Sequence, residues 1–381
     1  MTDQRLKLKE LNLKGFKSID AEGQSISFGD VTVFLGANGA GKSNLVSFFK
    51  LLHYLTTGAL QTFIGEQGYA DSLLHYGAST TARIQATLKF EQGEAGEDTY
   101  GFTLSHASGD TLIFTEESVT WQKAGRPRPQ KVDLKAGHKE ANIIEDAKQS
   151  GTTSRTSRFI LNLLRLCRVY QFHDTSGTAK IRNYGYIGDG DYLRDNAGNL
   201  AAFLYGMSSR QEFRKYYERI VRHIQLVMPQ FGDFILRPSP ANRNSINLDW
   251  TDKGRGYHFG PHQLSDGSLR FMALATLLLQ PPSTLPRVIV LDEPELGLHP
   301  AAISNFSGMV RTASVNSQVI LATQSPRLVD EFDPEQIVIV EWDGKADRSI
   351  FRRPDKDALS DWLERYSLSE LWEKNILGGR P

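Results

Sequence analysis

A glycine-rich octapeptide carries the clearest chemistry in the sequence. Residues 36–43 read GANGAGKS and fit the pattern G-x-x-x-x-G-K-[ST], directly after the apolar run 31–35 and directly before a helical pattern. Glycines let backbone N–H groups face a phosphate, and the N-terminus of the next helix adds positive potential. A chance turn is the alternative, which the flanking patterns disfavour. The residues expected to contact a nucleotide are Gly36, Asn38, Gly39, Gly41, Lys42, Ser43 and Asn44. Ser43 would also bind Mg²⁺.

A second signal lies far downstream, where an apolar run ends in two adjacent carboxylates. Residues 287–293 read RVIVLDE, as in a Walker B motif. We expect Asp292 to hold Mg²⁺ through water and Glu293 to orient or deprotonate the water that attacks the terminal phosphate. Taken alone, the pattern also fits a strand followed by an acidic turn, but the upstream phosphate loop favours the catalytic interpretation.

A third signal opens an apolar helix at residues 264–268, which read LSDGS. The hydroxyl of Ser265, the backbone at Gly267 and the N–H groups of a helix start can together bind an anion. The local alternative is a helix cap without a ligand. For the pentapeptide taken alone, the two interpretations are about equally common.

The order of these motifs resembles the heads of ABC-type ATPases. In that resemblance, LSDGS corresponds to the signature LSGGQ, and the segment 294–300, PELGLHP, belongs to the D-loop. The opening residues LKGFKSI resemble the RecF, SMC and overcoming-lysogenisation-defect ATPases of the AAA group. The stretch between Ser43 and Leu264 is too long for the helical insert of a transporter cassette. The resemblance covers roughly residues 5–55 and 260–345, and it implies ATP and Mg²⁺ as cofactors and ATP hydrolysis as the activity.

The resemblance also implies assembly. In ABC-type heads the signature faces away from its own phosphate loop, so Ser265 and Gly267 would contact the γ-phosphate held by a second copy, in a homodimer or higher oligomer. His299 lies in the D-loop or only starts a helix. Gln324 stands where many relatives have a histidine that contacts the γ-phosphate. Glutamine can form hydrogen bonds but cannot take up a proton as histidine does. We therefore expect slow ATP hydrolysis, or a protein that uses bound ATP as a switch.

Two further segments contain residues with more than one possible role. Gln171 and His173, in the segment VYQFHD, are candidates for the Mg²⁺-sensing Q-loop, although a solvated glutamine is the commoner situation. Lys17, in GFKS, either reaches the phosphates or is a solvated turn lysine.

The elements that must position these residues form an α/β pattern. Alternating runs predict an antiparallel sheet, and buried-type runs around a helix predict parallel strands. Together with the resemblance, which implies a P-loop NTPase of the ABC-ATPase type, this pattern leads us to expect a mixed or antiparallel N-terminal β-lobe, a parallel-sheet core and a helical lobe. The strands expected are 82–90, 99–105, 111–121, 130–134, 287–291, 318–323 and 337–342, and the helices are 44–56, 199–207, 210–228 and 300–313. The predicted domains are 1–180 (N-terminal ATPase lobe), 181–260 (helical lobe) and 261–381 (C-terminal ATPase lobe).

Charge and composition limit the partners. Lys plus Arg equals Asp plus Glu at 44 each, so no overall field attracts nucleic acid or an anionic membrane. A basic segment, 123–139, could grip a phosphate backbone together with Arg155, Arg158, Arg165 and Arg168. Because no aromatic residues are interleaved there, we favour a solvated, mobile loop over 122–158. The single cysteine, Cys167, and the lack of an apolar leader or membrane span predict a cytoplasmic protein.

Three functions remain open from the sequence. The first, by resemblance to stand-alone bacterial antiphage ATPases, is the sensor or regulatory ATPase of a defence system that controls a separate effector such as a nuclease. Only 45 residues follow Gln336, too few for a TOPRIM nuclease domain. The second is a RecF-like repair clamp that binds duplex DNA with ATP, which the neutral charge disfavours. The third is an ATP switch that does not hydrolyse its nucleotide.

Overall fold

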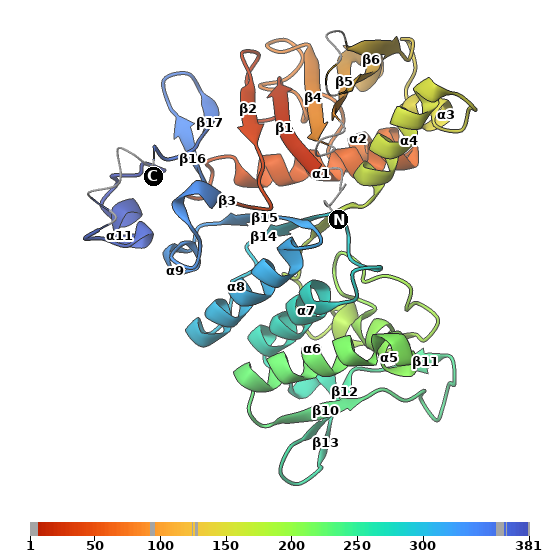
Figure 1. Ribbon diagram of the computed structural model, residues 1–381, viewed down its shortest axis with the longest axis vertical. Helices are drawn as coiled ribbons and strands as arrows, with labels where there is room; N and C mark the ends of the chain where they lie inside the picture. Colours follow the sequence, from red (N-terminus) through yellow and green to blue (C-terminus); the bar gives the residue numbers. More distant parts are fainter. Residues whose placement is uncertain are drawn as a thin grey trace. The chain divides into compact units, whose positions relative to one another are not determined.

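The chain divides into two compact units, Met1–Arg168 with Pro334–Pro381 and Val169–Asp333. The computed structural model describes residues 7–91, 96–123, 125, 129–355, 362 and 364–379 (Figure 1). Within these residues, no helix combines the length and the apolar character that a membrane crossing requires.

The first unit contains a six-stranded antiparallel sheet. Its strand order is β2-β1-β4-β5-β6-β7, with β1 (Lys7–Lys14), β2 (Gln24–Ser27), β4 (Arg83–Glu91), β5 (Gly96–Ala107), β6 (Thr111–Lys123) and β7 (Gln130–Asp133). Alternate side chains of β4, such as Ile84 and Leu88, are buried, while their neighbours stay accessible. This period of two confirms the strands that the sequence predicted.

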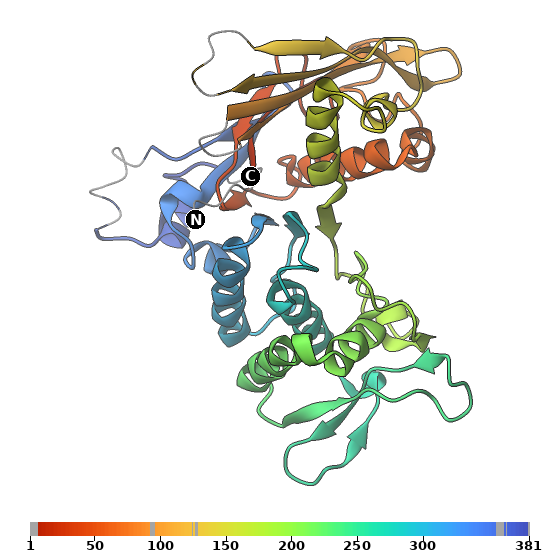
Figure 2. The same ribbon diagram turned by 45° about the vertical axis from the view of Figure 1, so that its right-hand side comes forward.

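Helices cover the apolar face of this sheet. They are α1 (Lys42–Thr57), α2 (Leu60–Glu66), α3 (Ile143–Asp146) and α4 (Thr152–Arg165). Phe48 and Phe49 of α1 make edge contacts with Phe16 and Phe28, at centroid distances of 5.6 and 5.9 Å. Figure 2 shows α4 against β5 and β6.

The segment 122–158, predicted as a mobile loop, contains regular structure in its described part: α3 and the start of α4 lie there, while β7 falls on the predicted strand 130–134. Residues 150–157 are rich in serine and threonine, which suggested a loop. In the structure Ser154 and Ser157 are small enough to be buried where α4 packs. Part of the basic segment, residue 124 and residues 126–128, lies outside the described residues.

The first unit also holds the strand that leads into the phosphate loop. β3 (Val31–Leu35) is buried at every position and pairs in parallel with β16 (Ile337–Asp343). β16 pairs in turn with antiparallel β17 (Arg348–Arg352). The short helix α11 (Leu368–Glu373) follows.

The second unit contains a parallel pair. β14 (Val288–Asp292) and β15 (Gln318–Thr323) are buried throughout and are joined by α8 (Pro300–Ser314). α7 (Asp266–Leu279) packs between α8 and α6 (Arg214–Val227), with α5 (Leu200–Ser209) alongside (Figure 1). These elements confirm the predicted strand–helix–strand order. β8 (Cys167–Tyr170) leads from the first unit into the second along the chain.

A small antiparallel sheet next to α6 was missed by the sequence analysis. Its order is β10-β12-β13, with β10 (Phe231–Ile235), β12 (Asp249–Asp252) and β13 (His258–Phe259). Trp250 stacks on Phe259 at a centroid distance of 4.4 Å and on Phe231 at 5.8 Å. The strands are two to five residues long and rich in aspartate, so no alternating pattern could develop. The remaining short elements are η2 (Lys180–Arg182), β9 (Gly185–Tyr186), η3 (Gln211–Phe213), β11 (Ser245–Ile246), η4 (Pro261–Gln263), α9 (Pro326–Val329) and η5 (Pro334–Gln336).

Candidate functional site

The phosphate loop of the first unit is shaped by glycines that admit no side chain. A Cβ atom at Gly36 would overlap the carbonyl oxygen of Val340 in the neighbouring strand. Gly41 has a φ of 112°, and a Cβ atom there would overlap the hydroxyl of Ser349. The Ser349 hydroxyl itself donates to the carbonyl of Ala40 at 2.6 Å. The loop is therefore held in its turned shape from outside by β16 and β17.

Lys42 lies within the loop and binds its backbone. Its side chain is 5% exposed, and Nζ donates to the carbonyl oxygens of Gly36 at 2.6 Å and Ala37 at 2.9 Å. Ser43 is exposed at the start of α1, as a ligand of a nucleotide-bound cation must be. The ammonium thus occupies the concave side of the loop, where the phosphates of a nucleotide would bind.

A cavity of about 390 Å³ borders the loop. Asn38 and Gly39 line it together with Trp342 from the end of β16 and Gly379. Two predicted contact residues therefore face open space. Asn44 is half-buried in the first turn of α1, where its N–H donates to the carbonyl of Gly41 at 3.1 Å.

In the second unit, Asp292 ends β14 with one carboxylate oxygen unused. The residue is 7% exposed, and its Oδ2 accepts a hydrogen bond from Gln171 Nε2 at 2.9 Å. His173 Nε2 lies 2.9 Å from the backbone oxygen of Asp292. Oδ1 is buried and has no hydrogen-bond partner among the described residues. A buried carboxylate oxygen without a donor fits a cation such as Mg²⁺, which takes one or two carboxylates and completes its shell with water and phosphate.

Glu293 follows in a strained backbone conformation. Its φ is 44°, its N–H donates to the carbonyl of Ala322 at 2.8 Å, and its Oε1 accepts from Gln324 Nε2 at 3.1 Å. Non-glycine residues with positive φ are uncommon and often lie at functional sites. The two residues predicted as catalytic are therefore in direct contact. Nearby, the hydroxyl of Thr323 donates to the carboxylate of Glu295, which the sequence analysis did not single out.

The LSDGS segment forms the start of α7. Ser265 is the N-cap: its Oγ accepts from the N–H of Ser268 at 3.1 Å and lies 2.8 Å from the Ser268 hydroxyl. A Cβ atom at Gly267 would overlap the carbonyl oxygen of Gly297, in the predicted D-loop. Glycine is thus required at position 267 because the start of α7 meets the backbone of Gly297 there.

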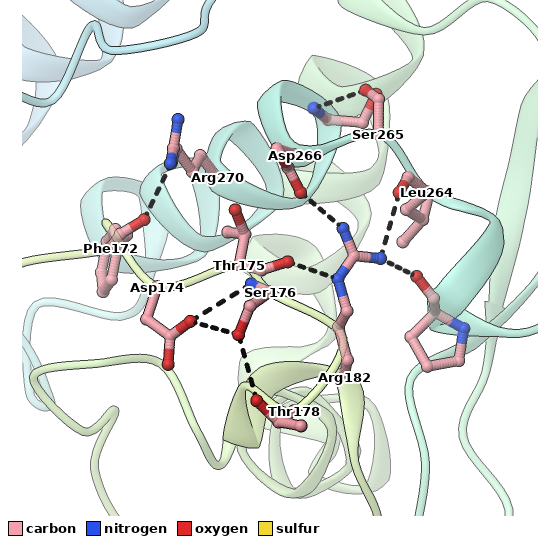
Figure 3. A network of polar contacts seen from close by, with 12 residues as sticks. Phe172, Asp174, Thr175, Ser176, Thr178, Arg182, Leu264, Ser265, Asp266 and Arg270 are labelled. Atoms are coloured by element: carbon pink, nitrogen blue, oxygen red, sulfur yellow. Dashed lines mark hydrogen bonds and ion pairs between the residues drawn. The ribbon is translucent and has the colours of Figure 1, made fainter.

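Arg270, one turn into α7, was not predicted as a site residue. It donates to the carbonyl oxygens of Phe172 at 3.0 Å, His173 at 2.9 Å and Leu296 at 2.8 Å. Figure 3 shows its contact with Phe172. This side chain joins the signature helix to the segment of Gln171 and to the D-loop. A lone arginine in an otherwise apolar helix was the signal that could have revealed it.

Lys17 and His299 both make contacts within the chain. Lys17 Nζ donates to Ser47 Oγ at 2.9 Å and to Gln67 Oε1 at 3.1 Å, so its side chain is not the solvated turn lysine of the second alternative. Burial lowers the pKa of Lys17, and the charge of Lys50 lowers it further. His299 caps α8 by accepting from the N–H of Ala301 at 3.3 Å, which confirms the helix-start alternative.

A glycine-rich phosphate loop, an acidic strand end and a signature-like helix start define a P-loop ATPase of the ABC type. The chain belongs to the AAA domain family, whose profile matches residues 10–220. A second profile, described as an AAA domain and candidate AbiEii toxin of a Type IV TA system, matches residues 168–330. No curated protein matched the chain.

Solved structures of Smc heads share the fold. The SmcHead bound to the C-winged helix domain of ScpA has a TM-score of 0.57 at 16% identity, covering 93% of this chain and 99% of that one. An Smc head domain from Pyrococcus furiosus, with an extended coiled coil and bound to the C-terminal domain of ScpA, gives 0.55 at 15% identity, covering 94% and 99%. The Thermotoga maritima SMC head gives 0.50 at 17% identity, covering 92% and 99%.

Proposed function

We propose that this protein binds Mg·ATP and hydrolyses it as an ABC-type head, within a homodimer or higher assembly. The observation that carries the proposal is the end of β14, where one buried oxygen of Asp292 accepts no hydrogen bond from any residue that the structure describes and Glu293 is held by Gln324. A structural acidic turn would not need either feature. The phosphate loop supports it with Lys42 on its concave side.

Each residue has a role that its chemistry allows. Ser43 and Asp292 would hold Mg²⁺, which neutralises charge on the phosphates when bound. Gln171, hydrogen-bonded to Asp292, would register whether the cation is present. Glu293 would orient or deprotonate the attacking water, with Gln324 fixing its carboxylate. Because Gln324 cannot take up a proton, turnover would be slow.

The start of α7 supports the proposed assembly. Ser265 and Gly267 offer a hydroxyl and helix N–H groups to an anion. In ABC-type heads this surface meets the γ-phosphate of a second subunit. We therefore propose that each ATP is enclosed by the phosphate loop of one chain and the signature of another.

For the cellular role, we propose a regulatory ATPase of a bacterial antiphage system that controls a separate effector such as a nuclease. The AbiEii toxin description of the family matched by residues 168–330 supports a defence role. The Smc heads solved with parts of ScpA support the idea that heads of this fold take protein partners. The alternative is a RecF-like clamp on duplex DNA.

The test combines turnover, assembly and DNA binding. We expect purified protein to release phosphate from ATP only with Mg²⁺, and sedimentation to show a larger species with ATP in the Glu293→Gln variant than without nucleotide. No ATP binding by the wild type would refute the proposal. For the alternative, ATP-dependent duplex binding that weakens steeply with salt would favour the clamp. Indifference to DNA together with a co-purifying effector would favour the defence role.

A further inference from the structure

Arg182 is a buried cation that neither the motifs nor the proposed chemistry uses. It ends η2 and is 6% exposed. Its guanidinium donates to the carbonyl oxygens of Thr175 at 2.7 Å, Pro261 at 2.5 Å and Leu264 at 3.1 Å, and to Asp266 Oδ1 at 2.8 Å (Figure 3). Four acceptors, one at residue 175 and three within residues 261–266, are thus held by one planar group.

These contacts bracket Ser265. Arg182 binds the carbonyl of the residue before it, Leu264, and the carboxylate of the residue after it, Asp266. Ser265 is therefore held on both sides, through the backbone of Leu264 and through the side chain of Asp266, and its Oγ accepts from the N–H of Ser268 at 3.1 Å. Figure 3 shows Ser265 on the opposite side of the helix start from the guanidinium.

We propose that Arg182 and Asp266 are a positioning pair that presents Ser265 to the phosphate of a second copy. The inference rests on the proposed function, in which Ser265 completes the site of another chain. It gives a role to the aspartate that stands at the third signature position, where the related motif LSGGQ has glycine. Neither residue touches the nucleotide; both act through Ser265.

The two partners contribute differently. The guanidinium is buried, so its three carbonyl acceptors are needed to offset the loss of water. The side chain of Asp266 is 64% exposed and supplies the negative charge that directs one end of the guanidinium. The hydrogen bond from Arg182, followed by one from the side chain of Thr175, lowers the pKa of Asp266, so the carboxylate is ionised at neutral pH.

The same arginine reaches the segment that contacts the cation-binding residue. Thr175, which accepts from Arg182, lies two residues after His173 and four after Gln171, and both of these contact Asp292. Within the second unit, a set of hydrogen bonds that is linked by the backbone of residues 171–175 thus runs from Asp292 to the signature. Removing Asp266 should loosen the signature end of this set while leaving the Asp292 end intact.

The test uses Asp266→Asn, which keeps size and one acceptor but removes the charge at an exposed position. Arg182→Lys is the second variant, and Asp191→Asn, with an 87% exposed side chain in the same unit, is the matched control. In nucleotide-free protein, we expect hydrogen exchange at the amides of Ser268 and Leu269 to speed up by about fivefold or more in both variants, because local opening becomes easier.

With nucleotide, the variants should separate binding from turnover. ATP affinity of the dilute subunit should stay within about twofold, while kcat falls by about tenfold, the pattern of a lost transition-state interaction. The double variant, Arg182→Lys with Asp266→Asn, should have a kcat no lower than that of the less active single variant, because the two residues act as one pair. The proposed role of the pair would be refuted by unchanged hydrogen exchange at Ser268 and Leu269 or by turnover at the wild-type rate. A loss of ATP affinity as large as the loss of kcat would also refute it. If the wild type itself binds no ATP, the proposed function fails, whereas the exchange measurement still decides whether Arg182 and Asp266 hold the helix start.

Discussion

Replacing Lys42 by alanine tests the phosphate loop most directly. At an effective dielectric constant of about 20, an ammonium about 3 Å from a singly charged phosphate oxygen gains about 5 kcal/mol. In the nucleotide-free loop, however, Nζ already donates to Gly36 and Ala37 at 2.6 and 2.9 Å. Giving up two charge-assisted hydrogen bonds, each worth about 1.5 kcal/mol at the low end, removes about 3 kcal/mol of that gain.

The net contribution of Lys42 is therefore about 2 to 3 kcal/mol, so Lys42→Ala should weaken Mg·ATP binding by about 30- to 150-fold. Equilibrium titration with a fluorescent ATP analogue measures this. Lys50→Ala, two turns further along α1, makes the same charge change away from the loop and should bind as the wild type does. An affinity for Lys42→Ala within error of the control would contradict the assignment of the loop.

The remaining predictions concern catalysis, assembly and stability. Glu293→Gln should keep Mg·ATP binding but lower phosphate release by about 100-fold or more; wild-type release would exclude Glu293 as the base. Ser265→Arg should leave subunit ATP affinity unchanged and abolish turnover, and mixing it with Lys42→Ala should restore part of the activity; full activity of Ser265→Arg alone would reduce the signature to a helix cap. Burial raises the pKa of Asp98 to about 6, so the folded state favours its protonated form and wild-type stability is lost as pH rises from the ordinary value of 3.8 through 6. Asp98→Asn should then be more stable by about 1 kcal/mol at pH 7.5, after allowing for solvent screening, and equal to the wild type at pH 3 in denaturant titrations.

The parts of the fold that the sequence predicts are those in which burial repeats with a period. Buried and accessible residues alternate strictly along β4, so the apolar residues Ile84, Leu88 and Phe90 predict a strand with one buried face. The continuous apolar runs of β14 and β15 predict buried parallel strands, which the structure contains. The sequence analysis did not predict the start of α4, because its first turn is rich in serine and threonine. The usual preference of these residues for loops is overridden here by tertiary packing.

The residues of the candidate site also fall into two groups, those that a sequence pattern predicts and those that it does not. Motif residues such as Lys42 and Asp292 are predictable because phosphate and cation chemistry prescribe both residue type and spacing. Arg182 and Arg270 are not, since most of their partners are backbone carbonyl oxygens, which every residue supplies and no sequence pattern marks. Lys17 shows the same limit, because its partner Gln67 is 50 residues away.

The close approach of Gly267 to the carbonyl of Gly297 has a kinetic consequence. With no room for even a methyl group between the signature and the D-loop, and with Arg270 bound to Leu296 beside them, the two segments form one preorganised surface. In the proposed assembly, little conformational entropy would be lost when two chains meet, so association would be fast. The lifetime of the assembly would then depend on how long ATP bridges the two surfaces, which makes cleavage of the nucleotide the event that lets the chains separate.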